Sequence, residues 1–137
     1  MQKHILTPSS LPAPRGYNHG ILTEGGRILW LAGQDASDAN GNITAPGDMV
    51  AQFEQVLRNL QAVVAEAGGT MQDIVKLNIF TTDRGLYKAN LKALGKVMRA
   101  YFDGYYPAMA LFEVKSLFQD HALIEMEGVA VVKSSPD

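Results

Sequence analysis

The chain has 137 residues, of which 47% are hydrophobic, and carries a net charge of −2 without any cysteine. This length and apolar content predict a single domain, residues 1–137, with its own core. The lack of cysteine excludes disulfides, thiolate metal sites and a cysteine nucleophile. The acidic balance and scattered basic residues argue against a nucleic-acid-binding surface. No apolar run reaches the roughly 18 residues of a membrane span, so we expect a cytoplasmic protein with no membrane partner.

Short strands and turns are expected in the first part of the chain. Residues 3–6 are typical of a short strand, and the prolines within residues 7–14 end it because proline cannot donate to a ladder. Two apolar runs, residues 21–24 and 27–34, flank Gly25-Gly26, which predicts a β-hairpin. His4, His19 and His121 have no metal-binding spacing, so we expect no metal site.

Two amphipathic helices follow. From Met49 to Ala67 apolar residues recur every three or four positions, and Gly68-Gly69 ends this helix. The second apolar stripe runs over residues 86–101 and includes the polar Asn90. On its own, an Asn on such a stripe is more often bonded to backbone than to a ligand. Because each helix has one apolar stripe, both should cover the same face of a sheet.

The remaining strands are expected at residues 73–82, 105–114 and 123–131. In the last of these, Glu125 and Glu127 alternate with apolar residues and therefore share one face. Two carboxylates among apolar neighbours cost free energy unless each finds a partner or water. This arrangement suggests a cleft.

The predicted order is β-ββ-α-β-α-ββ, an α+β fold in which two helices pack on one face of a mixed sheet. The other face then needs a cover. Its apolar residues are expected to be Leu29, Leu31, Leu111, Val129 and Val131. Burial against further copies of the same chain would provide that cover.

Several short segments, taken together, point to one family. They are Gly16-Tyr17-x-x-Gly20, Leu31-Ala32-Gly33-Gln34, the helix end Ala67-Gly68, Val75-Lys76-Leu77, the helix with Asn90, Tyr106-Pro107-Ala108 and Ile124-Glu125-Met126-Glu127. The pattern spans nearly the whole chain and resembles the Rid, or YjgF, family of enamine/imine deaminases. The resemblance implies a chorismate-mutase-like fold, a barrel-like homotrimer with clefts between subunits, a small-molecule substrate and no cofactor.

The resemblance also assigns roles to residues. Glu125 and Tyr17 stand at cleft positions of the family, which implies that Glu125 is a general acid/base and that Tyr17 hydrogen-bonds the leaving nitrogen or a water. Asn90 stands at a substrate-binding position. The plainer interpretations are a solvated or lysine-paired Glu125, a Tyr17 that only packs, and a structural Glu127.

Three positions depart from the family. Active members carry an arginine, which clamps the substrate carboxylate, where this chain has Met109. Leu111 and Ala32 replace small polar or thiol residues, so the substrate pocket becomes more apolar. Arg15 and His19 lie near Tyr17, and Arg15 could supply the missing cation; a surface arginine and a half-exposed histidine are the plainer interpretations.

The sequence thus favours a cofactor-free hydrolase that converts a reactive enamine or imine to a carbonyl compound and ammonia. The loss of arginine at position 109 predicts a substrate other than the usual amino-acid-derived imino acids. One alternative is a trimer that binds or senses a small molecule without turning it over. A ribonuclease or translation inhibitor is the weakest alternative, because the chain is acidic and has no pair of catalytic histidines.

Overall fold

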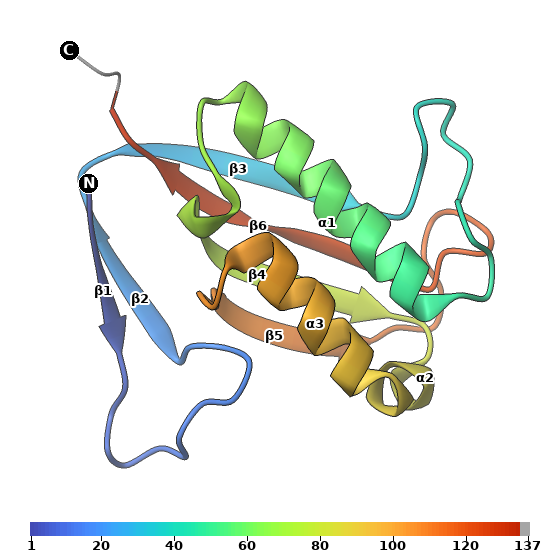
Figure 1. The fold of residues 1–137 in the computed structure, drawn as a ribbon, viewed down its shortest axis with the longest axis horizontal. Coiled ribbons are helices and arrows are strands. Elements are labelled where there is room, and N and C mark those ends of the chain that lie inside the picture. The colour runs from blue at the N-terminus through green and yellow to red at the C-terminus, as the bar shows by residue number, and fades with distance from the viewer. Residues whose placement is uncertain (135–137) are drawn as a thin grey trace.

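A four-stranded mixed sheet is the centre of the computed structural model, which describes residues 1–134 (Figure 1). Its strand order is β3 (Arg27–Gln34), β6 (Ile124–Val132), β4 (Ile74–Thr81) and β5 (Ala108–Glu113). Strand β6 is antiparallel to β3 and β4, whereas β4 and β5 run parallel. The mixed sheet and the order of strands and helices along the chain confirm the predicted α+β class.

The N-terminal segment forms a separate two-stranded sheet of β1 (Gln2–Leu6) and β2 (Gly20–Glu24). The predicted hairpin across Gly25-Gly26 is therefore wrong, because β2 pairs with β1 and β3 pairs with β6. Both glycines have positive φ angles, 75° and 84°, a conformation that glycine adopts without strain. The turn directs the chain from one sheet into the other.

Two long helices, α1 (Met49–Glu66) and α3 (Leu91–Phe102), cover one face of the four-stranded sheet (Figure 1). Asp48 caps α1 by accepting a hydrogen bond from the Ala51 amide, and Gly68 follows its end with a φ of 84°. A short 3-10 helix η1 (Met71–Asp73) leads into β4. These features confirm the first predicted helix and its glycine end.

The second predicted helix is divided at Asn90 into α2 (Arg84–Ala89) and α3. The Asn90 side chain donates its Nδ2 hydrogen bond to the Leu86 carbonyl at 2.8 Å, and its own backbone N–H turns back to Tyr87. This local bonding competes with a continuous helix ladder. Asn90 therefore forms the joint between the two helices.

The core lies between the helices and the sheet. Its largest fully buried side chains include Phe53, Phe102, Leu57, Leu60, Leu77, Ile79, Ile124 and Met126. In β6 the buried residues alternate with Glu125 and Glu127, so the prediction that both carboxylates share the other face is confirmed.

The face away from the helices is open and apolar, as predicted, but most of the residues expected there lie elsewhere. Leu31, only 5% exposed, and Leu29 pack into the core, and so does Leu111. Val129 and Val131 do stand on the predicted face, because they lie opposite Trp30 and Ile28 of β3, although Val131 is only 4% exposed. Alternation shows which residues share a face but not which face the helices cover, so a shift of one residue reverses the assignment.

We call the uncovered surface of the four-stranded sheet the open face. It carries Ile28 and Trp30 of β3, 60% and 74% exposed, and Phe112 of β5, 47% exposed. Phe80 of β4 stacks on Phe112 with ring centroids 5.5 Å apart. Patches of this kind on a small domain mark an interaction surface.

Candidate functional site

A cavity of about 310 Å³ lies along the edge strand β5. We call it the edge cavity; its lining residues are Gly16, Tyr17, Ile79, Tyr87, Met109, Ala110 and Leu111. The loop that carries Tyr17 is held beside β5 by Asn18, whose amide N–H donates to the Pro107 carbonyl at 3.0 Å and whose Nδ2 donates to the Tyr106 carbonyl at 2.6 Å. The volume is within the range of small-molecule sites.

The edge cavity is mostly apolar, with two phenols. Met109 and Leu111 contribute apolar side chains, and the hydroxyl-bearing rings are Tyr17 and Tyr87. Burial raises the pKa of Tyr87 to about 12, so its hydroxyl stays protonated near neutral pH and can donate a hydrogen bond. The sequence analysis missed Tyr87 as a site residue because it lies on an apolar helix stripe; its polar tip three residues before Asn90 was the available clue.

His19 and Arg15 flank the edge cavity without lining it. The His19 Nε2 lies 2.7 Å from the Pro12 carbonyl, so that nitrogen carries a proton and donates. The His19 ring packs edge-on against the Tyr17 ring, with 5.2 Å between the centroids. This contact helps to hold the Tyr17 ring in position. Arg15 lines an adjoining cavity instead. Asn90 uses its Nδ2 to hold α2 and lines neither cavity.

Glu125 lies on the open face, away from the edge cavity. It stands opposite Phe80 on β4, whereas Leu111 stands opposite Ile79, and neighbouring residues of a strand point to opposite faces. A Cβ atom placed on Gly33 would overlap Oε2 of Glu125, so the glycine provides the space that the carboxylate occupies. Ala32 lies exposed next to it on β3.

The environment of Glu125 favours its protonated form. Partial burial, then the charges of Asp35 and Glu127, raise the pKa of this carboxyl above its ordinary value. Such a group can hold and donate a proton closer to neutral pH than an ordinary glutamate. Perturbed carboxyls with this combination of causes are common at functional sites.

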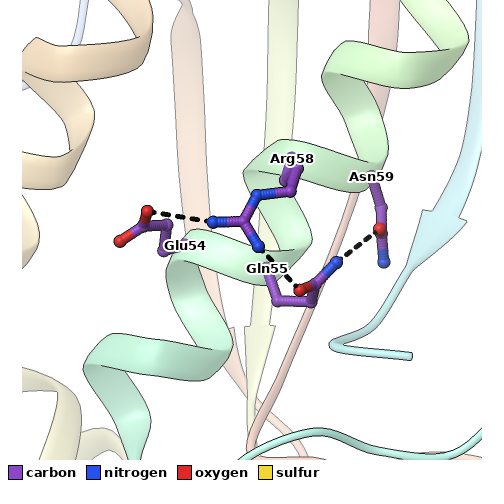
Figure 2. Close-up of polar contacts among 4 residues, drawn as sticks. All are labelled: Glu54, Gln55, Arg58 and Asn59. Atoms are coloured by element: carbon purple, nitrogen blue, oxygen red, sulfur yellow. Dashed lines mark hydrogen bonds and ion pairs between the residues drawn. The ribbon is translucent and has the colours of Figure 1, made fainter. Parts of the chain in front are cut away.

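Asp35 is held in place from helix α1. Its carboxylate accepts hydrogen bonds from the backbone N–H and hydroxyl of Ser37, and its carbonyl accepts one from Asn59 Nδ2 at 3.0 Å. Figure 2 shows how the Asn59 amide is oriented by Gln55, which in turn contacts Arg58, the partner of Glu54. This polar network fixes the loop whose charge acts on Glu125.

The predicted site residues thus form two groups. Tyr17, Met109 and Leu111 meet in the edge cavity, with Arg15 and His19 beside it, whereas Glu125 lies on the open face against Gly33, the residue after the exposed Ala32. Within residues 1–134, no group of three or more His, Asp or Glu side chains is arranged to bind a metal ion. None of the helices in this part of the chain has the length and apolar character to cross a membrane.

Comparison with known proteins decides the family. The family model described as Endoribonuclease L-PSP matches residues 7–132. The Rid-family protein YyfB of Yersinia pestis is 33% identical and superposes with a TM-score of 0.86 over 96% of this chain and 100% of that one. The chain belongs to the Rid, or YjgF, family.

Two further relatives show how widely this Rid fold is shared. A RutC family protein of Pyrococcus abyssi is 30% identical over 131 residues, which are 95% of this chain and 98% of the relative. The YjgF gene product of E. coli is 29% identical, with a TM-score of 0.64 over 84% of this chain and 87% of that one. The family expected from the short segments is therefore confirmed.

Proposed function

We propose that this Rid-family protein hydrolyses a small, reactive enamine or imine to a carbonyl compound and ammonia in a cleft between subunits. The observation that supports it is the division of the site. A cavity with Tyr17 opens at one edge of the sheet, while Glu125, with its raised pKa, lies on the apolar open face. The edge cavity provides Tyr17 and the open face provides Glu125. An assembly that places the edge cavity of one subunit against the open face of another would therefore complete the site.

The assembly that we propose is a homotrimer with chorismate-mutase-like subunits. Ile28, Trp30 and Phe112 leave large apolar areas on the open face, which supports its burial against other copies of the chain. Light scattering should give three times the chain mass of 14.9 kDa. A monomer mass at micromolar concentration would contradict both the trimer and the shared cleft.

The chemistry requires one proton carrier and one oriented water. An enamine tautomerises to its imine, and protonation of the imine nitrogen makes the attached carbon electrophilic. Glu125 would donate this proton and then take one from the attacking water, which forms a carbinolamine; collapse of the carbinolamine breaks the C–N bond and releases ammonia. Tyr17 would hydrogen-bond the departing nitrogen or the water.

The proposed role of Glu125 is tested by isosteric amides. Glu125→Gln should fold and bind ligand but lower ammonia release by about 100-fold or more, the usual contribution of a positioned acid/base. Glu127→Gln, on the same face of β6, is the matched control and should have a much smaller effect. The substrates are imines generated in the assay by oxidases acting on a panel of amines. Equal turnover by parent and Glu125→Gln would rule out this mechanism.

A second candidate function is a trimer that binds or senses a small molecule without chemistry. Met109 favours it, because the edge cavity has no cation of its own yet remains open. Ligand binding without ammonia release in the parent and both variants would support the sensor. A ribonuclease is disfavoured by the net charge of −2, although the family model carries an endoribonuclease name.

A further inference from the structure

A second cavity of about 210 Å³ adjoins the edge cavity, and we call it the inner chamber. Gly16, Tyr87 and Met109 line both cavities and therefore form the wall between them. Met109 is an unbranched thioether with three rotatable side-chain bonds. Met109 is therefore the most flexible part of the shared wall.

The inner chamber has an apolar side on α3 and a polar side with Arg15, Tyr87 and Tyr106. Leu91, Leu94 and Met98 of α3 provide apolar walls. Gly95 lies among them in the helix interior, where glycine is unfavourable, and a Cβ placed on it would meet no atom within 4 Å. The space next to Gly95 is therefore free of other protein atoms.

Arg15 is the charged residue of the inner chamber. Among residues 1–134, the two ion pairs are His4–Glu24 and Arg58–Glu54, so the Arg15 guanidinium has no carboxylate partner in that part of the chain. A guanidinium binds a carboxylate through two parallel hydrogen bonds. Arg15 lies two residues before Tyr17 in the chain and lines the inner chamber, whereas Tyr17 lines the edge cavity and Met109 lines both.

We infer that the two cavities form one extended site for a substrate whose carboxylate is separated from its C=N group by an apolar spacer. The C=N group lies beside Tyr17 in the edge cavity, the spacer passes Met109 into the inner chamber, and the carboxylate pairs with Arg15. The substrate class is the imine of an ω-carboxylated aldehyde or ketone, not an α-imino acid. This inference rests on the proposed function for the identity of the reacting group, but its binding geometry is tested separately.

The test uses stable carboxylates and the full-length protein in its native assembly. Isothermal titration calorimetry compares acetate, butanoate and hexanoate, with hexanamide as the uncharged match to hexanoate. In the parent, affinity should rise by about fourfold for each methylene that enters the chamber, and hexanoate should bind more tightly than hexanamide. Equal affinity for acetate and hexanoate would overturn the inference.

Arg15→Gln tests the cation directly. It should weaken hexanoate binding by about threefold to tenfold and leave hexanamide unchanged. Arg99→Gln is the matched control, because Arg99 lies on α3 but does not line the chamber, and it should change neither ligand. Equal effects of the two substitutions on hexanoate would overturn the assignment of Arg15.

Gly95→Ala tests the chamber without weakening the fold. The methyl group meets no atom, so the melting temperature should rise by about 3 °C through better helix propensity, while hexanoate affinity falls and acetate affinity stays the same. Unchanged hexanoate affinity would place the ligand outside the chamber. If the chain-length dependence holds but no imine is hydrolysed, the extended site stands and the proposed deaminase activity fails.

Discussion

Met109 separates two kinds of substrate recognition. A thioether provides apolar contact and flexibility but no charge, so it cannot neutralise a carboxylate placed directly beside the reacting carbon. Met109 lines both the edge cavity and the inner chamber, so a substitution that changes the size or charge at this position acts on both spaces at once. A change of this one residue should therefore shift the substrate class in a defined direction.

We expect the parent to accelerate hydrolysis of 2-iminopropanoate very weakly or not at all. Met109→Arg should raise that rate by about tenfold, because the guanidinium supplies the charge and fork geometry that a short carboxylate needs. The same substitution should reduce hexanoate binding, since the longer side chain enters the chamber. Met109→Leu is the size control and should gain nothing. Clearance of 2-iminopropanoate by the parent as fast as by an arginine-bearing relative would contradict the inferred change of class.

The raised pKa of Glu125 should make the free energy of unfolding depend on pH. The pKa of this carboxyl in the folded state lies above that of an unfolded glutamate, so between the two values the native state binds more protons than the unfolded state. Stability therefore falls as pH rises through this window, and the full penalty is present above the raised folded-state pKa.

Glu125→Gln removes this titration. The variant should be more stable than the parent near neutral pH, and the difference should shrink as the pH is lowered through the raised pKa of Glu125. Urea unfolding at a series of pH values measures it, with the exposed Glu66→Gln as control. A stability difference that grows on acidification would show that burial and the charges of Asp35 and Glu127 do not act on this group as described.

At the scale of elements, the join between β4 and β6 depends on a glycine. The pairing shifts by one residue between Ile74 and Lys76, and this irregularity brings the Lys76 carbonyl against Gly128. A Cβ at Gly128 would overlap that backbone oxygen, which cannot move without breaking the ladder.

Gly128→Ala should therefore destabilise the protein by about 2 kcal/mol or more. Gly95→Ala is the opposite case, because its Cβ meets open space within a helix, and it should stabilise by up to about 1 kcal/mol. Urea denaturation of both variants measures the contrast. Equal stability of Gly128→Ala and the parent would mean that the close approach at the shifted register does not exist.

The elements that the sequence predicted well are those set by local patterns. The apolar stripe and glycine end of α1 depend on helical periodicity, and the shared face of Glu125 and Glu127 depends on strand alternation. The pairing of β2 with β1 instead of β3, and the burial of Leu29, Leu31 and Leu111, depend on long-range contacts that no local pattern encodes. The same limit applies to the site, because Tyr87 and the space beside Gly95 become visible only when α2 and α3 pack on β5.

At the scale of the whole molecule, the open face connects the fold to the proposed chemistry. The apolar side chains Trp30, Ile28 and Phe112 share this face with Glu125, so the assembly that buries them would also dry the surroundings of the carboxylate. Loss of water raises the free energy of the charged form and strengthens hydrogen bonds to a bound imine. Catalysis by Glu125 is therefore expected to depend on assembly of the subunits.

The most direct test of the shared cleft mixes two inactive variants. Tyr17→Ala removes a phenol from the edge cavity, and Glu125→Gln removes the carboxylate from the open face; each alone should abolish most ammonia release from the substrate that the parent turns over. When the two chains are co-expressed and assemble at random, about one cleft in four combines an intact cavity with an intact carboxylate, so about a quarter of the parental activity should return. Mixed assemblies that remain as inactive as the single variants would show that the two halves do not meet between subunits, and would contradict the account.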